Sequence, residues 1–253
     1  MKAFLKKEWM EWWRTGRFMV LLLIFVLFGI MNPAMAKLTP WLMETMSESL
    51  ADAGFVTTAV SVDAMTSWVQ FYKNIPVALI VFVLISSGNF TAEYEKGTLI
   101  PVVTRGLARW KILAAKAVFL LGVWTALYVI CFGITYGYNA YFWDNGVAGN
   151  LLFALVCTWM FGVWVTALLI FFSAVSKTGS QVLLGTGGVA LGVYLLDMFP
   201  KLDAFLPAKL MKGLELLQRV GGPEDFYASM AAAGVMVLLC MGLAALGFDR
   251  RQL

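Results

Sequence analysis

The chain has 253 residues, of which 61% are hydrophobic and only 13% are charged, and its formal net charge is +4. Such proportions exclude a water-soluble globular protein. The sequence contains no histidine and no Gly-x-x-x-x-Gly-Lys-Ser/Thr phosphate loop, which removes His-based triads, the usual zinc sites and ATP hydrolysis by this chain alone. We therefore expect no catalytic residue, no cofactor and no metal.

Six apolar stretches without any Asp, Glu, Lys or Arg run along the chain, each at least 19 residues long. About 20 apolar helical residues cross a bilayer, so each stretch predicts a transmembrane helix. The stretches are 18–36, 74–92, 117–143, 145–176, 178–196 and 226–248. The expected fold is an all-α membrane protein, a single transmembrane domain over 1–253, with spans at about 18–36, 74–92, 115–137, 150–174, 179–197 and 227–247.

The distribution of Lys and Arg predicts the orientation of these spans. If the connections alternate between the two sides, the side that holds the N-terminus carries 13 of the 19 basic residues. Basic residues are enriched in cytoplasmic loops, so we expect both termini to be cytoplasmic.

Residues 1–17 predict an amphipathic helix that lies in the membrane interface. Trp9, Trp12 and Trp13 fall on one half of a helical wheel, and basic residues fall mostly on the other. The pattern is imperfect, because Glu8 lies on the apolar side. The alternative is an ordinary basic flank with aromatic belt residues. In the outward connection 37–73, Leu42, Met46 and Leu50 recur at helical spacing and predict a short surface helix.

The cytoplasmic connection 91–112 carries the most distinctive local sequence. Two carboxylates, Glu93 and Glu95, follow the second span, and Gly97 and Thr98 come next. An apolar run broken by Pro101 then leads to a basic group of Arg105, Arg109, Lys111 and Lys116. Gly97 permits a sharp turn and Pro101 starts or kinks a helix, so we expect a short structured element. The alternative is that the basic residues only set topology and bind anionic lipid head groups.

Two later features concern packing. Gly185, Gly188 and Gly192 form a small-residue face on the fifth span, which favours close approach of another helix. In 198–225, Pro200 and Pro207 break the first part, and apolar residues from Leu210 to Leu217 predict an amphipathic helix. We expect these outward-facing helices to be either re-entrant or on the membrane surface.

With these elements in place, the sequence resembles the permease subunits of ABC-2-type exporters. The resemblance rests on a Glu-x-Glu-x-Gly-Thr-Leu segment after the second span and on a later Arg and Lys before the third. The corresponding positions here are Glu93, Glu95, Gly97, Thr98, Leu99, Arg105 and Lys116. The interfacial helix, the six spans and the outward segment extend the resemblance over nearly the whole chain.

The resemblance implies that the connection 91–112 forms a coupling helix that docks on a separate ABC ATPase. Glu93, Glu95, Gly97, Thr98, Arg105 and Arg109 would form the coupling site. Two ATPase copies and a second permease, as a homodimer or heterodimer, would complete an exporter in the plasma membrane of a prokaryote. Lipid is the other expected partner, and nucleic acid is not expected.

The absence of charge inside the apolar stretches favours an amphipathic or hydrophobic cargo. Ion-coupled carriers place ionisable groups in mid-span, and none lies within these stretches. Antimicrobial peptides and drugs are examples of cargo moved by similar permeases. The competing interpretation is a non-transporting polytopic membrane scaffold or sensor subunit, which would share the topology and the basic loop.

Overall fold

The computed structural model describes residues 2–52, 62–95, 97, 108–199 and 203–249, and all regular structure within these ranges is helical. The first helices are α1 (Lys2–Arg14), α2 (Arg17–Asp52), α3 (Ala64–Ser86) and α4 (Gly88–Glu95). They are followed by α6 (Arg109–Phe142), η1 (Asn145–Val147), α7 (Leu151–Val175), α8 (Gly179–Leu196), η2 (Pro207–Met211), α10 (Gly213–Leu217) and α11 (Glu224–Asp249).

Six helical segments in the described part of the chain are long and apolar enough to cross a membrane. They are Arg17–Leu42 of α2, Ala64–Tyr94 over α3 and α4, Arg109–Phe142, Leu151–Val175, Gly179–Leu196 and Glu224–Asp249. This confirms the predicted all-α architecture with six transmembrane helices.

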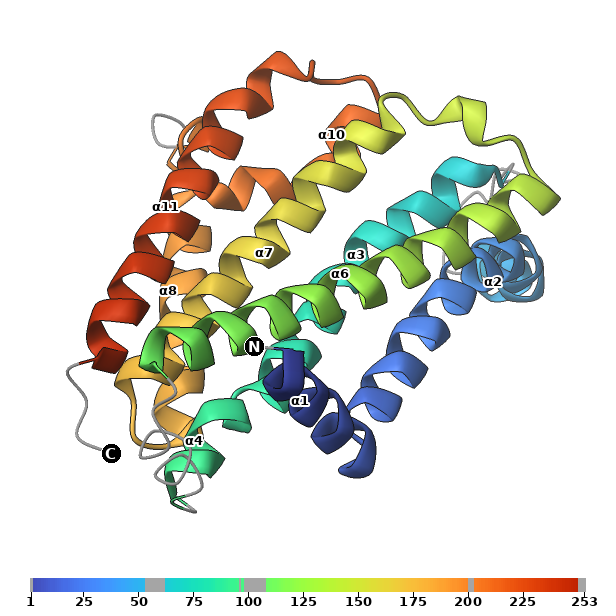
Figure 1. Ribbon diagram of the computed structural model, residues 1–253. Helices are drawn as coiled ribbons and strands as arrows, with labels where there is room; N and C mark the ends of the chain where they lie inside the picture. Colours follow the sequence, from blue (N-terminus) through green and yellow to red (C-terminus); the bar gives the residue numbers. More distant parts are fainter. Residues whose placement is uncertain (1, 53–61, 96, 98–107, 200–202, 250–253) are drawn as a thin grey trace.

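The helices form a bundle with two distinct ends. Helices α1 and α4 lie at one end, and η1, η2 and α10 lie at the other (Figure 1). We call them the α1–α4 end and the η end. Helix α7 contacts α6, α8 and α11 and is the most central element, whereas α2 packs chiefly on α3 and α6.

Helix α2 differs from the prediction for residues 37–73. A separate surface helix was expected there, but the helix of the first span continues without interruption to Asp52. No glycine occurs between Ile30 and Asp52, and good helix formers dominate the segment, which favours continuation of the helix. Pro33 and Pro40 lie inside it, and its course changes direction in Figure 1, as expected where proline removes a backbone donor.

Aromatic side chains fill the centre of the bundle. Trp124 of α6 packs edge-on against Phe25 of α2 and lies 5.6 Å from Phe82 of α3 between ring centroids. Its indole also covers Gly162 of α7, where an added Cβ would lie 2.0 Å from a ring carbon. The glycine therefore sets how closely α6 and α7 approach.

Polar side chains join α2, α3 and α6 inside the bundle. Asn74 donates to Asn32 Oδ1 at 2.8 Å, and Asn32 donates to Thr135 Oγ1 at 3.1 Å. Thr135 in turn donates to the Gly29 carbonyl at 3.1 Å. Hydrogen bonds of this kind between apolar helices hold the helices in register.

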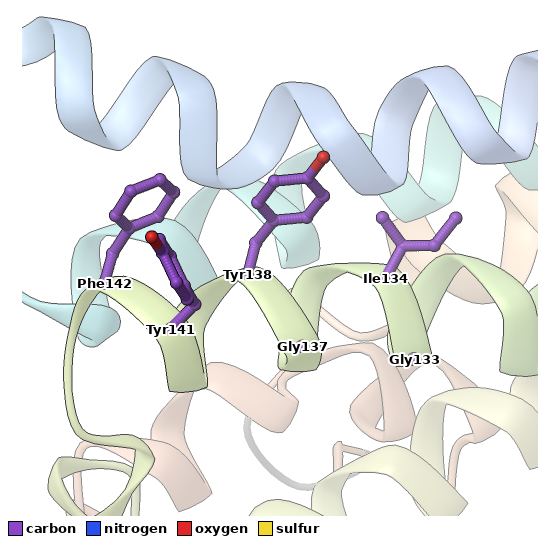
Figure 2. Close-up of a pocket in the computed structure, with 6 residues that line it drawn as sticks. All are labelled: Gly133, Ile134, Gly137, Tyr138, Tyr141 and Phe142. Carbon is purple, nitrogen blue, oxygen red and sulfur yellow. The ribbon is translucent and has the colours of Figure 1, made fainter.

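A shallow groove of about 460 Å³ runs along α6 toward the η end. Near its start Gly29 of α2 lies close to α6, since an added Cβ there would lie 3.0 Å from Ile134 Cβ. Figure 2 shows Ile134, Tyr138 and Phe142 of α6 pointing toward the neighbouring helix. At the outer end of the groove, Lys37 Nζ lies 3.8 Å from the centroid of the Phe142 ring.

The described part of 198–225 folds back into the bundle. One amphipathic helix was predicted from Leu210 to Leu217, but the segment forms two short elements, η2 and α10. Both pack on α7, and α10 also contacts α3. Gly213 at their junction lies against Tyr72, where an added Cβ would meet the ring at 2.5 Å. The helical course is interrupted at this junction, which packs beneath the Tyr72 ring.

Candidate functional site

A buried cluster of charges lies at the α1–α4 end, where three segments of the chain meet. It consists of Lys7 and Glu8 from α1, Glu93 from α4 and Lys116 from α6, and we call these four residues the ion cluster. Glu93 lies within the predicted coupling segment 91–112, in its first described part. The ion cluster therefore includes a residue of that segment.

The start of α6 explains how Lys116 becomes buried. The apolar stretch of the third span begins after Lys116, but the helix begins earlier, at Arg109. Its first two turns belong to the bundle, and Lys116 is 0% exposed. Glu93 and Lys116 lie outside the uncharged stretches but inside helical segments that can cross a membrane, because both helices extend beyond their uncharged cores.

Lys116 is the centre of the cluster. Its Nζ lies 3.0 Å from Glu8 Oε1 and 3.1 Å from Glu93 Oε2, and it donates a 2.9 Å hydrogen bond to the Asn89 carbonyl. Glu8 is fully buried and the Glu93 side chain is 6% exposed. A buried charge is tolerated only when it is paired, and this ammonium has two carboxylates and one backbone carbonyl within 3.1 Å.

Asn89 and aromatic rings enclose the ion pairs. Trp12 of α1 donates to Asn89 Oδ1 at 3.0 Å, which gives α1 a second tie to α4. Lys116 Nζ lies 5.0 Å from the centroid of the Phe90 ring and 5.9 Å from that of Phe4, distances at which an aromatic face attracts a cation. The surroundings exclude water and strengthen the pairs.

Lys7 forms the rim of the ion cluster, with a half-exposed side chain. It is hydrogen-bonded to Glu93 and lies 3.4 Å from Glu8 and 3.3 Å from Glu11. Partial burial by itself would lower the pKa of Lys7, but the hydrogen bond and charge of Glu93, with the charges of Glu8 and Glu11, raise it above its ordinary value.

In the ion cluster two ammonium groups face two carboxylates, and Glu11 adds a third carboxylate beside Lys7. Carboxylate oxygens of Glu8, Glu11 and Glu93 lie within 4.8 Å of one another, a spacing that a metal ion could bridge. The ammonium groups of Lys7 and Lys116 already pair with these oxygens. The arrangement is therefore suited to holding helices together, since α1, α4 and α6 share one charge network.

The predicted coupling residues do not all lie in one place in the structure. Glu93 belongs to the ion cluster. Glu95 is the last residue of α4, and its side chain lies outside the described residues, as do Thr98 and Arg105. Gly97 adopts a left-handed backbone with φ of +62°, and its N–H donates to the Tyr94 carbonyl at 3.1 Å, which forms a turn that ends α4.

Arg109 lies apart from the ion cluster. It begins α6, and its Nη1 donates to the carbonyls of Phe248 at 3.4 Å and Asp249 at 2.8 Å. These carbonyls are at the C-terminal end of α11, where a cation is favoured by the helix dipole. Arg109 thereby fastens the last helix to the third span.

Sequence reasoning missed Glu8 as a member of the site. The sequence did contain an indication, because Glu8 breaks the amphipathic pattern by lying on the apolar side of the helical wheel for residues 1–17. In the structure only part of that side faces the protein: Phe4, Glu8 and Trp12 are buried, whereas Trp9 and Trp13 are exposed. A charge on a buried helix face requires a partner, and Lys116 is that partner.

Two comparisons with known proteins bear on this arrangement. A family model described as ABC-2 family transporter protein matches residues 3–219. The chain is also 20% identical over 263 aligned residues to the uncharacterized transmembrane protein YxlG of Bacillus subtilis, covering 99% of this chain and 97% of that protein. The family match includes α1, the ion cluster and the first five spanning helices.

Proposed function

Because this chain belongs to the ABC-2 transporter family and is a multi-pass membrane permease subunit, we propose that it works in an ATP-driven exporter. A separate ABC ATPase, present in two copies, supplies the energy, and a second permease, identical or different, completes the pathway. The cargo is an amphipathic or hydrophobic molecule that leaves the cell, such as an antimicrobial peptide or a drug. The exporter resides in the plasma membrane of a prokaryote.

The α1–α4 end faces the cytoplasm in this proposal. The excess of Lys and Arg on the connections at this end supports the assignment, since such residues are retained on the cytoplasmic side. It would place both termini and the segment 91–112 where an ATPase can reach them. The exposed Trp9 and Trp13 of α1 would then lie in the cytoplasmic membrane interface.

The ion cluster is the observation that carries the coupling proposal. Glu93 lies near the start of the coupling segment and is joined through Lys116 to α6 and to Glu8 of α1. A displacement of the segment by an ATPase would therefore be passed to the third span and to α1 together. Buried ion pairs suit this role, because separating them is costly and the helices move as a unit.

The segment itself provides the means of docking. Glu95 and Arg105 supply charges of both signs around an apolar run with Gly97 and Thr98 at its start. Charge complementarity orients a partner, and a buried apolar anchor supplies affinity.

A competing function is that of a membrane scaffold or sensor subunit that transports nothing. The experiment that separates the two is co-purification of the tagged chain from its native membranes, with mass spectrometry of the bound proteins. We expect a P-loop ATPase in about equal amount, lost in the double variant Glu95→Lys, Arg105→Glu. Lys177→Glu is the matched control, since Lys177 is exposed in the α7–α8 connection at the same end of the bundle.

Transport in reconstituted vesicles completes this test. Export that needs ATP and is abolished by the loop variant, but not by Lys177→Glu, would support the exporter. Recovery of the native complex without any ATPase would instead favour the scaffold or sensor.

A further inference from the structure

A long groove of about 660 Å³ lies between α3 and α8. Leu79, Ile80 and Val83 line the α3 side, Ala190 and Leu191 line the α8 side, and Phe161 of α7 lies between them. The lining residues of α3 run from Tyr72 to Leu84, which corresponds to ~18 Å along a helix axis. The groove therefore offers a narrow apolar path along much of a membrane span.

The charged residues that line the groove, Asp197 and Lys212, lie at its η end. Asp197 Oδ2 lies 2.8 Å from Lys212 Nζ, and the same ammonium lies 2.7 Å from Asp203. Lys209 is a further cation, 3.6 Å from Asp203. Lys212 is thus shared between two carboxylates, and Asp203 has a second basic neighbour.

One carboxylate oxygen of Asp197 is available to accept a hydrogen bond from a cation. Its side chain is only 8% exposed, and its Oδ1 is buried without a hydrogen-bond partner among the described residues. A buried acceptor without a donor is costly, and a ligand that supplies the donor removes that cost. Burial raises the pKa of Asp197 above its ordinary value, and a cation bound at Oδ1 would oppose this shift by favouring the charged carboxylate.

The position of Asp197 at the end of α8 adds to this preference. It is the C-cap residue of the helix, and the end of α8 carries the negative pole of the helix dipole. Carboxylate and dipole therefore both attract positive charge to this end of the groove. An anionic group would have to take Lys212 from two carboxylates that already bind it.

We propose that this groove binds a cationic amphiphile, with its ammonium group on Asp197 and its apolar chain between α3 and α8. The assignment rests on the proposed export of an amphipathic cargo and narrows that cargo to molecules with a positively charged head. Asp197 selects the charge, and the apolar walls select a single long chain.

The test is equilibrium binding to the purified chain in phosphatidylcholine nanodiscs. Radiolabelled dodecylamine is the probe, with dodecanol and dodecanoate as neutral and anionic molecules of equal chain length. We expect dodecylamine to bind at least about tenfold more tightly than either, since a charge-assisted hydrogen bond is lost in both. Asp197→Asn should remove that preference. Glu215→Gln is the control, because Glu215 is an exposed carboxylate at the same end of the bundle that does not line the groove.

A second pair of variants tests the groove independently of charge. Ala190→Trp fills the groove and should abolish binding of dodecylamine, whereas Val189→Trp, on the neighbouring exposed position outside it, should leave binding unchanged. Thermal unfolding of each variant shows that it is folded.

Equal binding of dodecylamine and dodecanol, or a preference for dodecanoate, would overturn the proposal, as would unaltered binding by folded Asp197→Asn. The measurement needs neither an ATPase nor transport. Its failure leaves the exporter proposal standing, and loss of transport with intact amine binding would count against the exporter alone.

Discussion

Glu8 of the N-terminal helix and Lys116 of the third span form an ion pair of 3.0 Å in which neither side chain is exposed. The pair is closed from the other side by Glu93, 3.1 Å from the same ammonium. Lys116 thus connects α1, α4 and α6, three segments that are distant in sequence.

Replacement of Lys116 tests this dependence. Lys116→Met leaves two buried carboxylates without their shared cation, and we expect the free energy of unfolding to fall by about 3–5 kcal/mol. Thermal unfolding followed by tryptophan fluorescence would measure the loss. Lys111→Met is the control, since Lys111 is exposed on the same helix and should change stability by less than about 0.5 kcal/mol. A loss no larger than in this control would show that the ion cluster does not join the helices. Adding Glu8→Gln to Lys116→Met should recover part of the loss, because one unpaired charge is removed.

Lys7, at the rim of the ion cluster, should stabilise the fold less than Lys116 does. Its contribution to the free energy of unfolding should not vary with pH near neutrality. The pKa of Lys7 is raised from an ordinary 10.5, so its stabilisation is complete below the unfolded value and is lost only as pH rises through the folded one. Lys7→Met should cost about 1 kcal/mol or less, because the side chain is half-exposed. The difference from wild type should stay constant between about pH 6 and pH 9. A difference that shrinks within this range would contradict the assignment.

Gly162 is a test of packing between α6 and α7. An added methyl group would overlap Trp124, so Gly162→Ala should destabilise the protein by about 1–3 kcal/mol through forced displacement of the indole. Gly122→Ala on α6 is matched to it, since nothing lies within 4 Å of a Cβ there. That variant should be neutral or slightly stabilising, because alanine favours a helix over glycine. Equal effects of the two variants on the unfolding temperature would exclude the close contact.

Asn32 tests the polar connection inside the bundle. Asn32→Ala removes hydrogen bonds to Asn74 and Thr135 and should lower stability by about 1–2 kcal/mol, given the modest value of such bonds between membrane helices. Thr39→Ala is the control on the same helix, where the hydroxyl bonds only to the local Met35 carbonyl. If both variants unfold at the same temperature, the network does not contribute to stability.

The sequence by itself determined the class of protein and the number of spans. Whether a stretch crosses a membrane depends on its length and hydrophobicity, which are local properties that can be read from consecutive residues. The same holds for the turn at Gly97, where only a residue without a Cβ adopts the left-handed backbone easily.

Only the tertiary structure decided where the helices end and which charges meet. Helix α2 continues to Asp52, and α6 begins at Arg109, because polar and charged turns at the ends of a span can be helical when neighbouring elements pack on them. A charge is read from sequence as exposed unless a partner is known, and the partner of Lys116 is supplied by α1 and α4. Pairing between distant segments depends on the arrangement of the whole bundle, so no local pattern around Glu8 or Asp197 could have revealed it.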